Sequence, residues 1–216
     1  MQSPADEQLE LLDDDGLPLG RGKARAQVHV DGDWHRAFHL WVVREGRLVL
    51  LQRRSRHKDL EGGKLDVTVG GHVRVGETLV DVVREAEEEL GLAVRPGQLT
   101  FLGSARSVRS YEGGLDREIQ DVYAVRDERP LTEYALPCDE VEVLYEVPIE
   151  RAIDLYREGR YVAAAGYDCQ RRVSNALLVE DDVIDQGRAL TVRALERLRD
   201  WLSGTDPERW ASDPIA

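Results

Sequence analysis

Three glutamates, Glu85, Glu88 and Glu89, stand at positions i, i+3 and i+4 of a stretch with helical periodicity. On a helix their carboxylates are neighbours, and like charges at this spacing weaken an isolated helix. A bound divalent cation removes the repulsion, because Mg²⁺ and Mn²⁺ prefer hard carboxylate oxygens. The trio is therefore a candidate metal site, and its alternative interpretation is the solvated acidic face of an amphipathic helix.

Glycines and turn residues mark where the elements around the glutamates begin and end. A strand over 65–69 runs into Gly70 and Gly71, and a Gly-Glu-Thr turn follows at Gly76. Apolar residues at helical spacing then predict a helix from about 78 to 90. Gly91 stands where a left-handed cap would end that helix.

Residues in this stretch closely resemble the signature box of the Nudix hydrolase superfamily: Gly71, Glu77, Arg84, Glu85, Ala86, Glu88, Glu89, Gly91 and Leu92. The chain departs from the pattern once, because six residues rather than seven separate Glu77 from Arg84. This departure leaves the role of Glu77 open.

The resemblance implies which groups of the box do chemistry. Glu85, Glu88 and Glu89 would bind Mg²⁺ or Mn²⁺ as the cofactor, with the backbone carbonyl of Gly71 as a further ligand. Glu88 or Glu89 would act as general base. Arg84 would be catalytic by orienting Glu88, with a surface ion pair as the alternative.

A second resemblance, over residues 9–150, is to the Nudix branch related to isopentenyl diphosphate isomerase. It rests on Leu11, Leu12, Asp13, Arg25, His29, Trp34, His35, Arg36, Ala37, Leu51, Gln52, Arg53, Arg54, Ser55, Lys58, Asp59, Gly71, His72 and Val73. It implies a second metal site, with the candidate ligands His29, His35, His72, Asp116 and Glu118. The alternative for His35 and His72 is a structural hydrogen-bonding role, and for His39, inside an apolar run, we expect a buried structural residue.

The isomerases also need a catalytic cysteine just before the Gly-His pair, and here Gly70 occupies that position. Alkene isomerisation requires a positioned acid, so that machinery is incomplete. All three metal-binding glutamates of the hydrolase box are present. Both observations favour hydrolysis.

The implied reaction is hydrolysis of a phosphoanhydride in a nucleoside di- or triphosphate or a related small diphosphate compound. A basic cluster with Arg53, Arg54 and Lys58 is the candidate site for the substrate phosphates, and Tyr111 is a candidate for stacking on a base. Glu112, Asp116 and Glu118 are alternative bases. The competing functions are a catalytically silent binding module and, with less support, an isomerase. The resemblance leaves a homodimer open.

The chain order predicts an α/β fold. Strands are expected over 10–12, 37–43, 48–53, 65–69, 99–108, 118–126 and 140–147, and helices over 148–157 and 187–202. Residues 109–117 read as a loop, whereas 25–30 and 161–168 are undecided. The pattern suggests a mixed sheet between helices, which fits the implied Nudix α/β/α sandwich. We expect a disordered segment over 1–8, one domain over 9–203 and a loose tail over 204–216.

Bulk properties restrict the partners and the location. The chain has 216 residues and a net charge of −13, which argues against broad binding to nucleic acid or anionic membranes. No apolar run approaches the roughly 18 residues of a membrane span, and the acidic start lacks the pattern of a secretory signal. Cys138 and Cys169 have no C-x-x-C spacing and read as two lone thiols in a reducing compartment. We therefore expect a cytoplasmic protein.

Overall fold

The computed structural model describes residues 7–58, 60–210 and 215. The strands are β1 Gln8–Leu12, β2 Pro18–Ala24, β3 Trp34–Arg44, β4 Leu48–Arg54, β5 Leu65–Asp66, β6 Val69–His72, β7 Thr100–Tyr111, β8 Gly114–Arg126, β9 Val141–Pro148, β10 Val162–Asp168 and β11 Val173–Leu178. The helices are α1 Arg25–Asp31, α2 Leu79–Val82, α3 Arg84–Leu90, α4 Ile149–Glu158 and α5 Arg188–Leu202.

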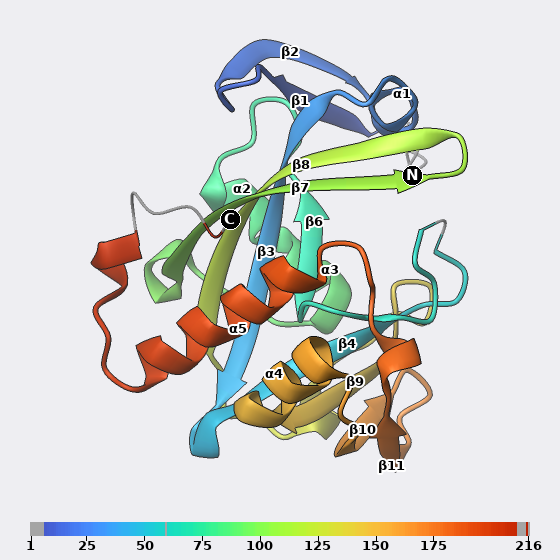
Figure 1. Cartoon of the computed structure of the whole chain (residues 1–216), viewed down its shortest axis with the longest axis vertical. Coiled ribbons are helices and arrows are strands. Elements are labelled where there is room, and N and C mark those ends of the chain that lie inside the picture. Colours follow the sequence, from blue (N-terminus) through green and yellow to red (C-terminus); the bar gives the residue numbers. More distant parts are fainter. Residues whose placement is uncertain (1–6, 59, 211–214, 216) are drawn as a thin grey trace.

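The long strand β3 organises a mixed sheet. It runs parallel to β8 over ten residue pairs and antiparallel to β6 over four. At its far end it meets β4 at only two pairs, after which β4 continues along β9. Strands β10 and β11 complete that side of the sheet (Figure 1).

Alternate side chains of β3 fill two separate cores, as the two-residue period of a strand requires. Trp41 and Val43 pack in one core with residues of α4 and α5. Phe38 and Leu40 pack in the other core with residues of α2 and α3. In Figure 1, α4 and α5 cover the near face of the sheet, with α3 behind it. The α/β/α sandwich expected from the sequence is confirmed.

The helix expected over 78–90 is interrupted. Thr78 caps α2, and Val83, with ψ of −12°, separates α2 from α3. One residue turns an α-helix by about 100°, so an uninterrupted helix with one residue fewer would aim Arg84 away from Glu77. The break at Val83 compensates for the missing residue. The expected end is confirmed, because Gly91 adopts φ of 62° and its N–H donates to the carbonyl of Glu87.

Several other boundaries differ from expectation. The loop expected over 109–117 is a tight hairpin, because β7 and β8 continue until only Glu112 and Gly113 form the turn. Gly113, with φ of 90°, supplies the conformation that such a turn needs. The two undecided segments are α1 and β10, and β11 was not expected.

The chain ends differ in part from the expected disordered start and loose tail. Residues 1–6, 211–214 and 216 lie outside the described part, whereas Gln8 begins β1. In the tail, Trp210 and Ile215 are buried against the core under α5. The single-domain division over 9–203 stays a prediction. None of the described helices combines the length and apolar character needed to span a bilayer.

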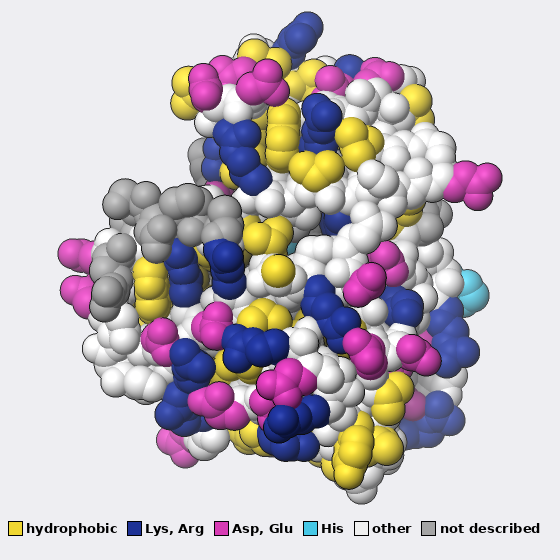
Figure 2. All heavy atoms as spheres, in the orientation of Figure 1, with side chains coloured by type: hydrophobic (Ala, Val, Ile, Leu, Met, Phe, Trp, Pro, Cys, Tyr) yellow, Lys and Arg dark blue, Asp and Glu magenta, His cyan; other side chains and the backbone are white. Residues whose placement is uncertain are grey.

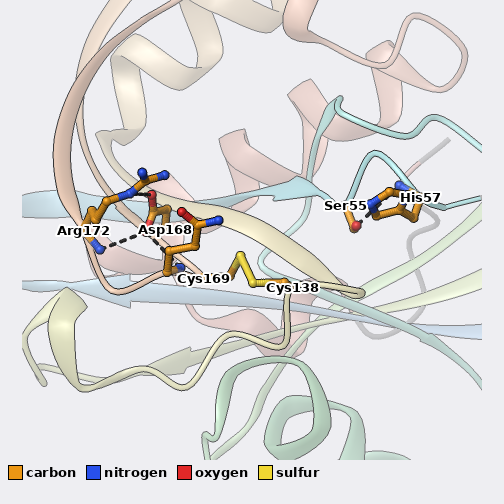
Figure 3. The surroundings of a disulfide bond; sticks show 7 residues. Ser55, His57, Cys138, Asp168, Cys169 and Arg172 are labelled. Carbon is orange, nitrogen blue, oxygen red and sulfur yellow. Dashed lines mark hydrogen bonds and ion pairs between the residues drawn. A yellow bond between two sulfur atoms is a disulfide. The ribbon is translucent and has the colours of Figure 1, made fainter.

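The expectation of two lone thiols is wrong. Cys138, just before β9, and Cys169, just after β10, form a disulfide with Cα atoms 5.1 Å apart (Figure 3). Pairing of β9 with β10 brings together two residues separated by 31 positions. The thiol argument for a reducing compartment therefore no longer holds, and the cytoplasmic location stays a prediction.

Candidate active site

One cleft of about 740 Å³ contains most of the candidate residues. The three box glutamates line it together with Gly71, and His29, His72, Asp116 and Glu118 line it as well. Strand β6 connects the two groups, because Gly71 and His72 are consecutive residues of it. The two candidate metal sites therefore belong to one continuous site.

Arg84 organises the box through three carboxylates. Its guanidinium contacts Glu77, with 2.9 Å from Nη2 to Oε1, and donates to Oε1 of Glu85. It also lies 3.5 Å from Oε2 of Glu88, four residues ahead on α3. Glu77 thus keeps a contact with Arg84 despite the shortened spacing. The backbone N–H of Arg74 donates to Glu77 at 2.8 Å and fixes that carboxylate from the other side.

Glu85 is a largely enclosed carboxylate and Glu89 a buried one. Burial raises the pKa of Glu85 to about 7, and burial together with the charge of Glu85 raises the pKa of Glu89 to about 8. Glu89 accepts a hydrogen bond from Gln52 at 3.2 Å. Glu88 is half exposed and faces the cleft. Two buried carboxylates whose charged forms are disfavoured fit a divalent cation, which would stabilise both charges.

Gly71 is the position where the backbone approaches the box most closely. A Cβ atom there would lie 2.5 Å from Cδ of Glu85. Only a residue without a side chain leaves the Glu85 carboxylate in its observed place. The expected pairing of Gly71 with the glutamates is thus matched by the local packing, while a role of its carbonyl as a ligand stays a prediction.

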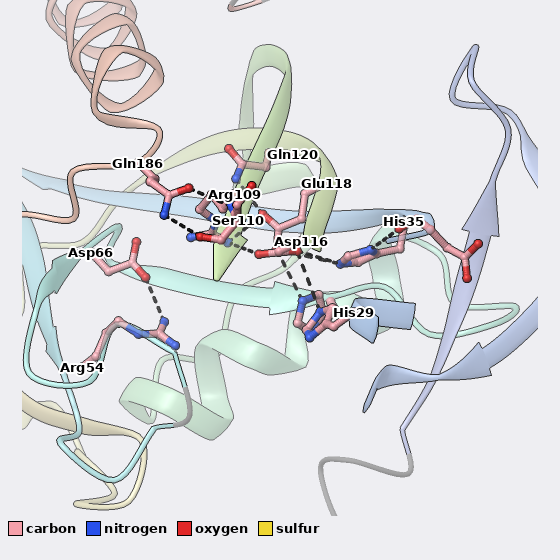
Figure 4. A network of polar contacts seen from close by, with 12 residues as sticks. His29, His35, Arg54, Asp66, Arg109, Ser110, Asp116, Glu118, Gln120 and Gln186 are labelled. Atoms are coloured by element: carbon pink, nitrogen blue, oxygen red, sulfur yellow. Dashed lines mark hydrogen bonds and ion pairs between the residues drawn. The ribbon is translucent and has the colours of Figure 1, made fainter. Parts of the chain in front are cut away.

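The second group, called here the histidine–carboxylate cluster, comprises His29, His35, His72, Asp116 and Glu118 (Figure 4 labels four of them). Candidate ligand atoms of the three histidines lie within 4.8 Å of one another, as do those of His35, Asp116 and Glu118. Parallel pairing of β3 with β8 places His35 beside Glu118. Residues from α1, β3, β6 and β8 therefore converge on one point.

The orientation of His35 is compatible both with a ligand and with a hydrogen-bonded structural residue. Its ring is fully buried, and Nδ1 lies 3.2 Å from the carbonyl of Asp33. With Nδ1 as the donor, Nε2 carries the lone pair and points into the cluster. Buried atoms in the cluster lack hydrogen-bond partners in the described structure, namely Nε2 of His29 and His35 and Oδ1 of Asp116. Unpartnered acceptors around one point fit a metal ion.

The protonation states in the cluster are compatible with a bound cation. Burial lowers the pKa of His29 to about 4 and of His72 to about 3, so both rings are neutral at pH 7. Arg109 donates to Oδ2 of Asp116 at 2.7 Å and lies 3.1 Å from Oε2 of Glu118. Burial alone would raise the pKa of Glu118, but Arg109 and His72 hold it well below its usual value. The other oxygen of each carboxylate faces the histidines.

The predicted phosphate-binding residues separate into two groups. Arg54, paired with Asp66 at 2.9 Å (Figure 4), and Lys58, paired with Glu140, line the cleft. Arg53 points away from it, since it bonds Asp182 at 2.8 Å and lies over the ring of Tyr145.

Tyr111 packs edge-on against His29 and is not among the described lining residues, and Glu112 lies in the β7–β8 turn. His39, expected to be a buried structural residue, is only partly buried and lines the cleft. Eight further polar lining residues were not singled out as site residues in the sequence: Glu7, Gln8, Arg25, Glu61, Asp66, Arg74, Arg109 and Glu140. An acidic residue inside the apolar run over 65–69 was the available signal for Asp66.

Residues 33–165 match the model of the NUDIX domain. The chain is 33% identical over 190 residues to an uncharacterized Nudix hydrolase of Clostridium acetobutylicum, covering 83% of this chain and 90% of that protein. The chain belongs to the NUDIX family. This NUDIX protein is accordingly a hydrolase that acts on diphosphate compounds.

Two further similarities concern the fold and the branch. The NUDIX chain is 35% identical over 158 residues to the isopentenyl-diphosphate Delta-isomerase of Cutibacterium acnes, covering 70% and 79% of the two chains. It superposes on the crystal structure of DR0079 from Deinococcus radiodurans with a TM-score of 0.55, at 22% identity, covering 71% and 91%. The resemblance to the isomerase branch is confirmed in sequence, and the Nudix fold in structure.

Proposed function

We propose that this NUDIX protein is a metal-dependent pyrophosphohydrolase that cleaves a phosphoanhydride bond in a nucleoside di- or triphosphate or a related diphosphate. The observation that carries the proposal is the Arg84 network, which links Glu77, Glu85 and Glu88 despite the shortened box. Mg²⁺ or Mn²⁺ would be held by Glu85, Glu88, Glu89 and the carbonyl of Gly71. It would supply charge neutralisation and Lewis acidity at the phosphate.

The protein's own groups bind the substrate and move the proton. Arg54 and Lys58 would receive the phosphate oxygens, since both line the cleft. Arg84 cannot act as a base and serves to position Glu85 and Glu88. Glu88 is our candidate general base, because it is the most exposed of the three glutamates and faces the cleft.

A second class of substrate is favoured by one observation. The described lining of the cleft contains no Trp, Tyr or Phe ring on which a nucleobase could stack. A small organic diphosphate, such as the isopentenyl diphosphate named for the isomerase relatives, needs no such surface. With Gly70 at the position of the isomerase thiol, hydrolysis is the reaction we propose for either substrate class.

The test is release of phosphate or monophosphate from a panel of nucleotides and small organic diphosphates, with Mg²⁺ and with Mn²⁺. Glu88→Gln removes one charge from the site and should lower turnover by about 100-fold or more, the loss typical for a group that stabilises a transition state. Glu87→Gln is the matched control, because Glu87 is exposed on the same helix and is absent from the described cleft lining. Equal turnover in both variants contradicts the proposal, and tight binding without turnover favours a silent binding module.

A further inference from the structure

A second cavity, of about 40 Å³, lies between the sheet and the helices α4 and α5, and we call it the side pocket. Strands β3, β7 and β8 line it from one side, and Tyr156 of α4 and residues of α5 line it from the other. His39, Asp66 and Arg109 line both the side pocket and the catalytic cleft. The side pocket is therefore a continuation of the cleft under the two helices, which cover this face of the molecule in Figure 2.

The lining of the side pocket becomes more polar toward the cleft. On β7 it consists of Ala105, Ser107 and Arg109, which alternate along the strand and therefore share one face. On β3 the lining residues are Trp41 and then His39, which is shared with the cleft. A group that enters from the cleft would pass these polar side chains before it reaches Trp41.

Two hydrogen-bond donors are buried in the lining without a partner. Trp41 and Tyr156 are each 2% exposed, and neither Nε1 of Trp41 nor the hydroxyl of Tyr156 has a hydrogen-bond partner in the described structure. Burial raises the pKa of Tyr156, so its hydroxyl keeps its proton at neutral pH. An indole N–H can only donate. Because an unpaired buried donor costs free energy, both groups favour a ligand that brings an acceptor.

The walls of the side pocket are held by specific contacts. The amide of Gln186, just before α5, both accepts from the N–H and donates to the carbonyl of Ser110, each at 2.8 Å (Figure 4). Arg188 donates to the backbone carbonyl of Tyr156 at 2.5 Å and connects the start of α5 to α4. A pocket that is already formed costs little conformational entropy when a ligand binds.

The size and place of the side pocket restrict what it can bind. A cavity needs about 10–15 Å³ to hold one water molecule, so about 40 Å³ accommodates a group of roughly three heavy atoms and no nucleobase. Arg54, our candidate for binding the phosphates, bonds Asp66 at 2.9 Å, and Asp66 lines the side pocket (Figure 4). A diphosphate held at Arg54 therefore needs only a short chain to reach the side pocket.

We propose that the side pocket binds a hydroxyl or carbonyl oxygen at the far end of a small diphosphate substrate, with Trp41 and Tyr156 as the donors. The inference rests on the proposed function, because it assumes that the diphosphate lies in the cleft, and it narrows the substrate to a small polar class. The hydrocarbon end of isopentenyl diphosphate would leave both donors unpaired, so such a compound is expected to be a poor substrate.

The experiment compares two diphosphates of equal length, one with a terminal hydroxyl (ω-hydroxypropyl diphosphate) and one with a terminal methyl (n-butyl diphosphate). We expect kcat/KM to be about 100-fold higher or more for the hydroxyl compound, because a site with buried donors rejects a ligand that cannot pair with them. Tyr156→Phe removes one donor and should reduce this preference about 10-fold. Equal rates for both compounds in the wild type would overturn the proposal, since water would then serve the donors as well as the substrate does.

Tyr145→Phe is the matched control. Tyr145 is buried as well, but its hydroxyl already accepts from Arg53 at 3.4 Å and it is not among the described lining residues of either cavity. This variant should keep the wild-type preference. Thermal melting checks folding, and Tyr156→Phe should melt no lower than the wild type, because its hydroxyl has no partner to lose in the described structure. A loss of preference that is equal in both variants would count against the side pocket.

A binding measurement separates this proposal from the proposed hydrolysis. The Nε1–H signal of Trp41 in a ¹⁵N-labelled protein is assigned by its loss in Trp41→Phe, and it is followed by NMR as non-hydrolysable methylene analogues of both compounds are added with Mg²⁺. We expect a shift with the hydroxyl analogue and a much smaller one with the methyl analogue. That result would support the side pocket even if no diphosphate were hydrolysed. A Trp41 signal that responds to neither analogue, or equally to both, would overturn the proposal even if hydrolysis were observed.

Discussion

Gly71→Ala tests whether the position of Glu85 controls catalysis. The new Cβ would lie 2.5 Å from Cδ of Glu85, whereas carbon atoms in contact sit about 3.5 Å apart or more. The Glu85 carboxylate must therefore retreat by about 1 Å. A displacement of this size in a catalytic site costs about 100-fold in rate, which corresponds to about 2.7 kcal/mol. We expect kcat to fall by that factor and the affinity for Mn²⁺ to fall with it.

Stability should change little in the same variant. No positive φ is associated with Gly71, so alanine adds no backbone strain there, and the three atoms nearest to the new Cβ all belong to the Glu85 side chain. The thermal midpoint of the metal-free protein should stay within a few degrees of the wild type, since a change of about 1 kcal/mol shifts it by only 2–4 °C. The loss of activity would then be one of geometry and not of folding.

Two other glycines provide the controls. A Cβ at Gly70 would make only ordinary contacts, 3.4 Å from Val67 and 3.9 Å from His39, and a Cβ at Gly97 would meet nothing within 4 Å. Gly70→Ala and Gly97→Ala should therefore retain activity within a few-fold. The measurements are steady-state hydrolysis and Mn²⁺ titration calorimetry on all three variants. If Gly71→Ala keeps both wild-type rate and metal affinity, the reasoning about Glu85 is refuted.

Two further outcomes concern metal binding. Because the pKa values of Glu85 and Glu89 are raised to about 7 and about 8, Mn²⁺ must displace protons below those values, and its affinity should increase by up to about 10-fold per pH unit for each carboxylate between pH 6 and 8. Over the same range the metal-free protein should become less stable as pH rises, since the folded state holds protons that the unfolded state has released. A stability that does not change with pH in calorimetry would argue against buried carboxylates. Asp116→Asn should lose one Mn²⁺ per chain, measured by elemental analysis after dialysis, while Asp139→Asn keeps the wild-type stoichiometry.

The box could be placed from the sequence because its geometry is local. Helical spacing alone puts Glu85, Glu88 and Glu89 on one side of a helix, and Gly91 ends it as expected. The break at Val83 could not be predicted in this way. It depends on where the preceding turn holds Glu77, and the propensities of residues 78–83 contain no signal for that contact.

Features that depend on distant pairing were harder to predict. The disulfide between Cys138 and Cys169 forms because β9 and β10 are neighbours, and their adjacency is set by the whole sheet. Strand β11 is exposed on both faces over most of its length, so it lacks the alternation by which half-buried strands are recognised. The histidine–carboxylate cluster was anticipated only through family resemblance, because its members come from four separate elements.

The charges that line the cleft support the proposal that metals and substrate bind together. Nine carboxylates and five Arg or Lys side chains are among its described lining residues, and the histidines there are neutral or contribute little charge at pH 7. A diphosphate entering such a site alone would meet net repulsion. Cations at the box and at the histidine–carboxylate cluster would reverse the sign of the local field, and Arg54 and Lys58 could then hold the phosphates between them. The acidic character that argues against nucleic acid binding is therefore compatible with a highly charged small substrate, provided that the metals arrive first or with it.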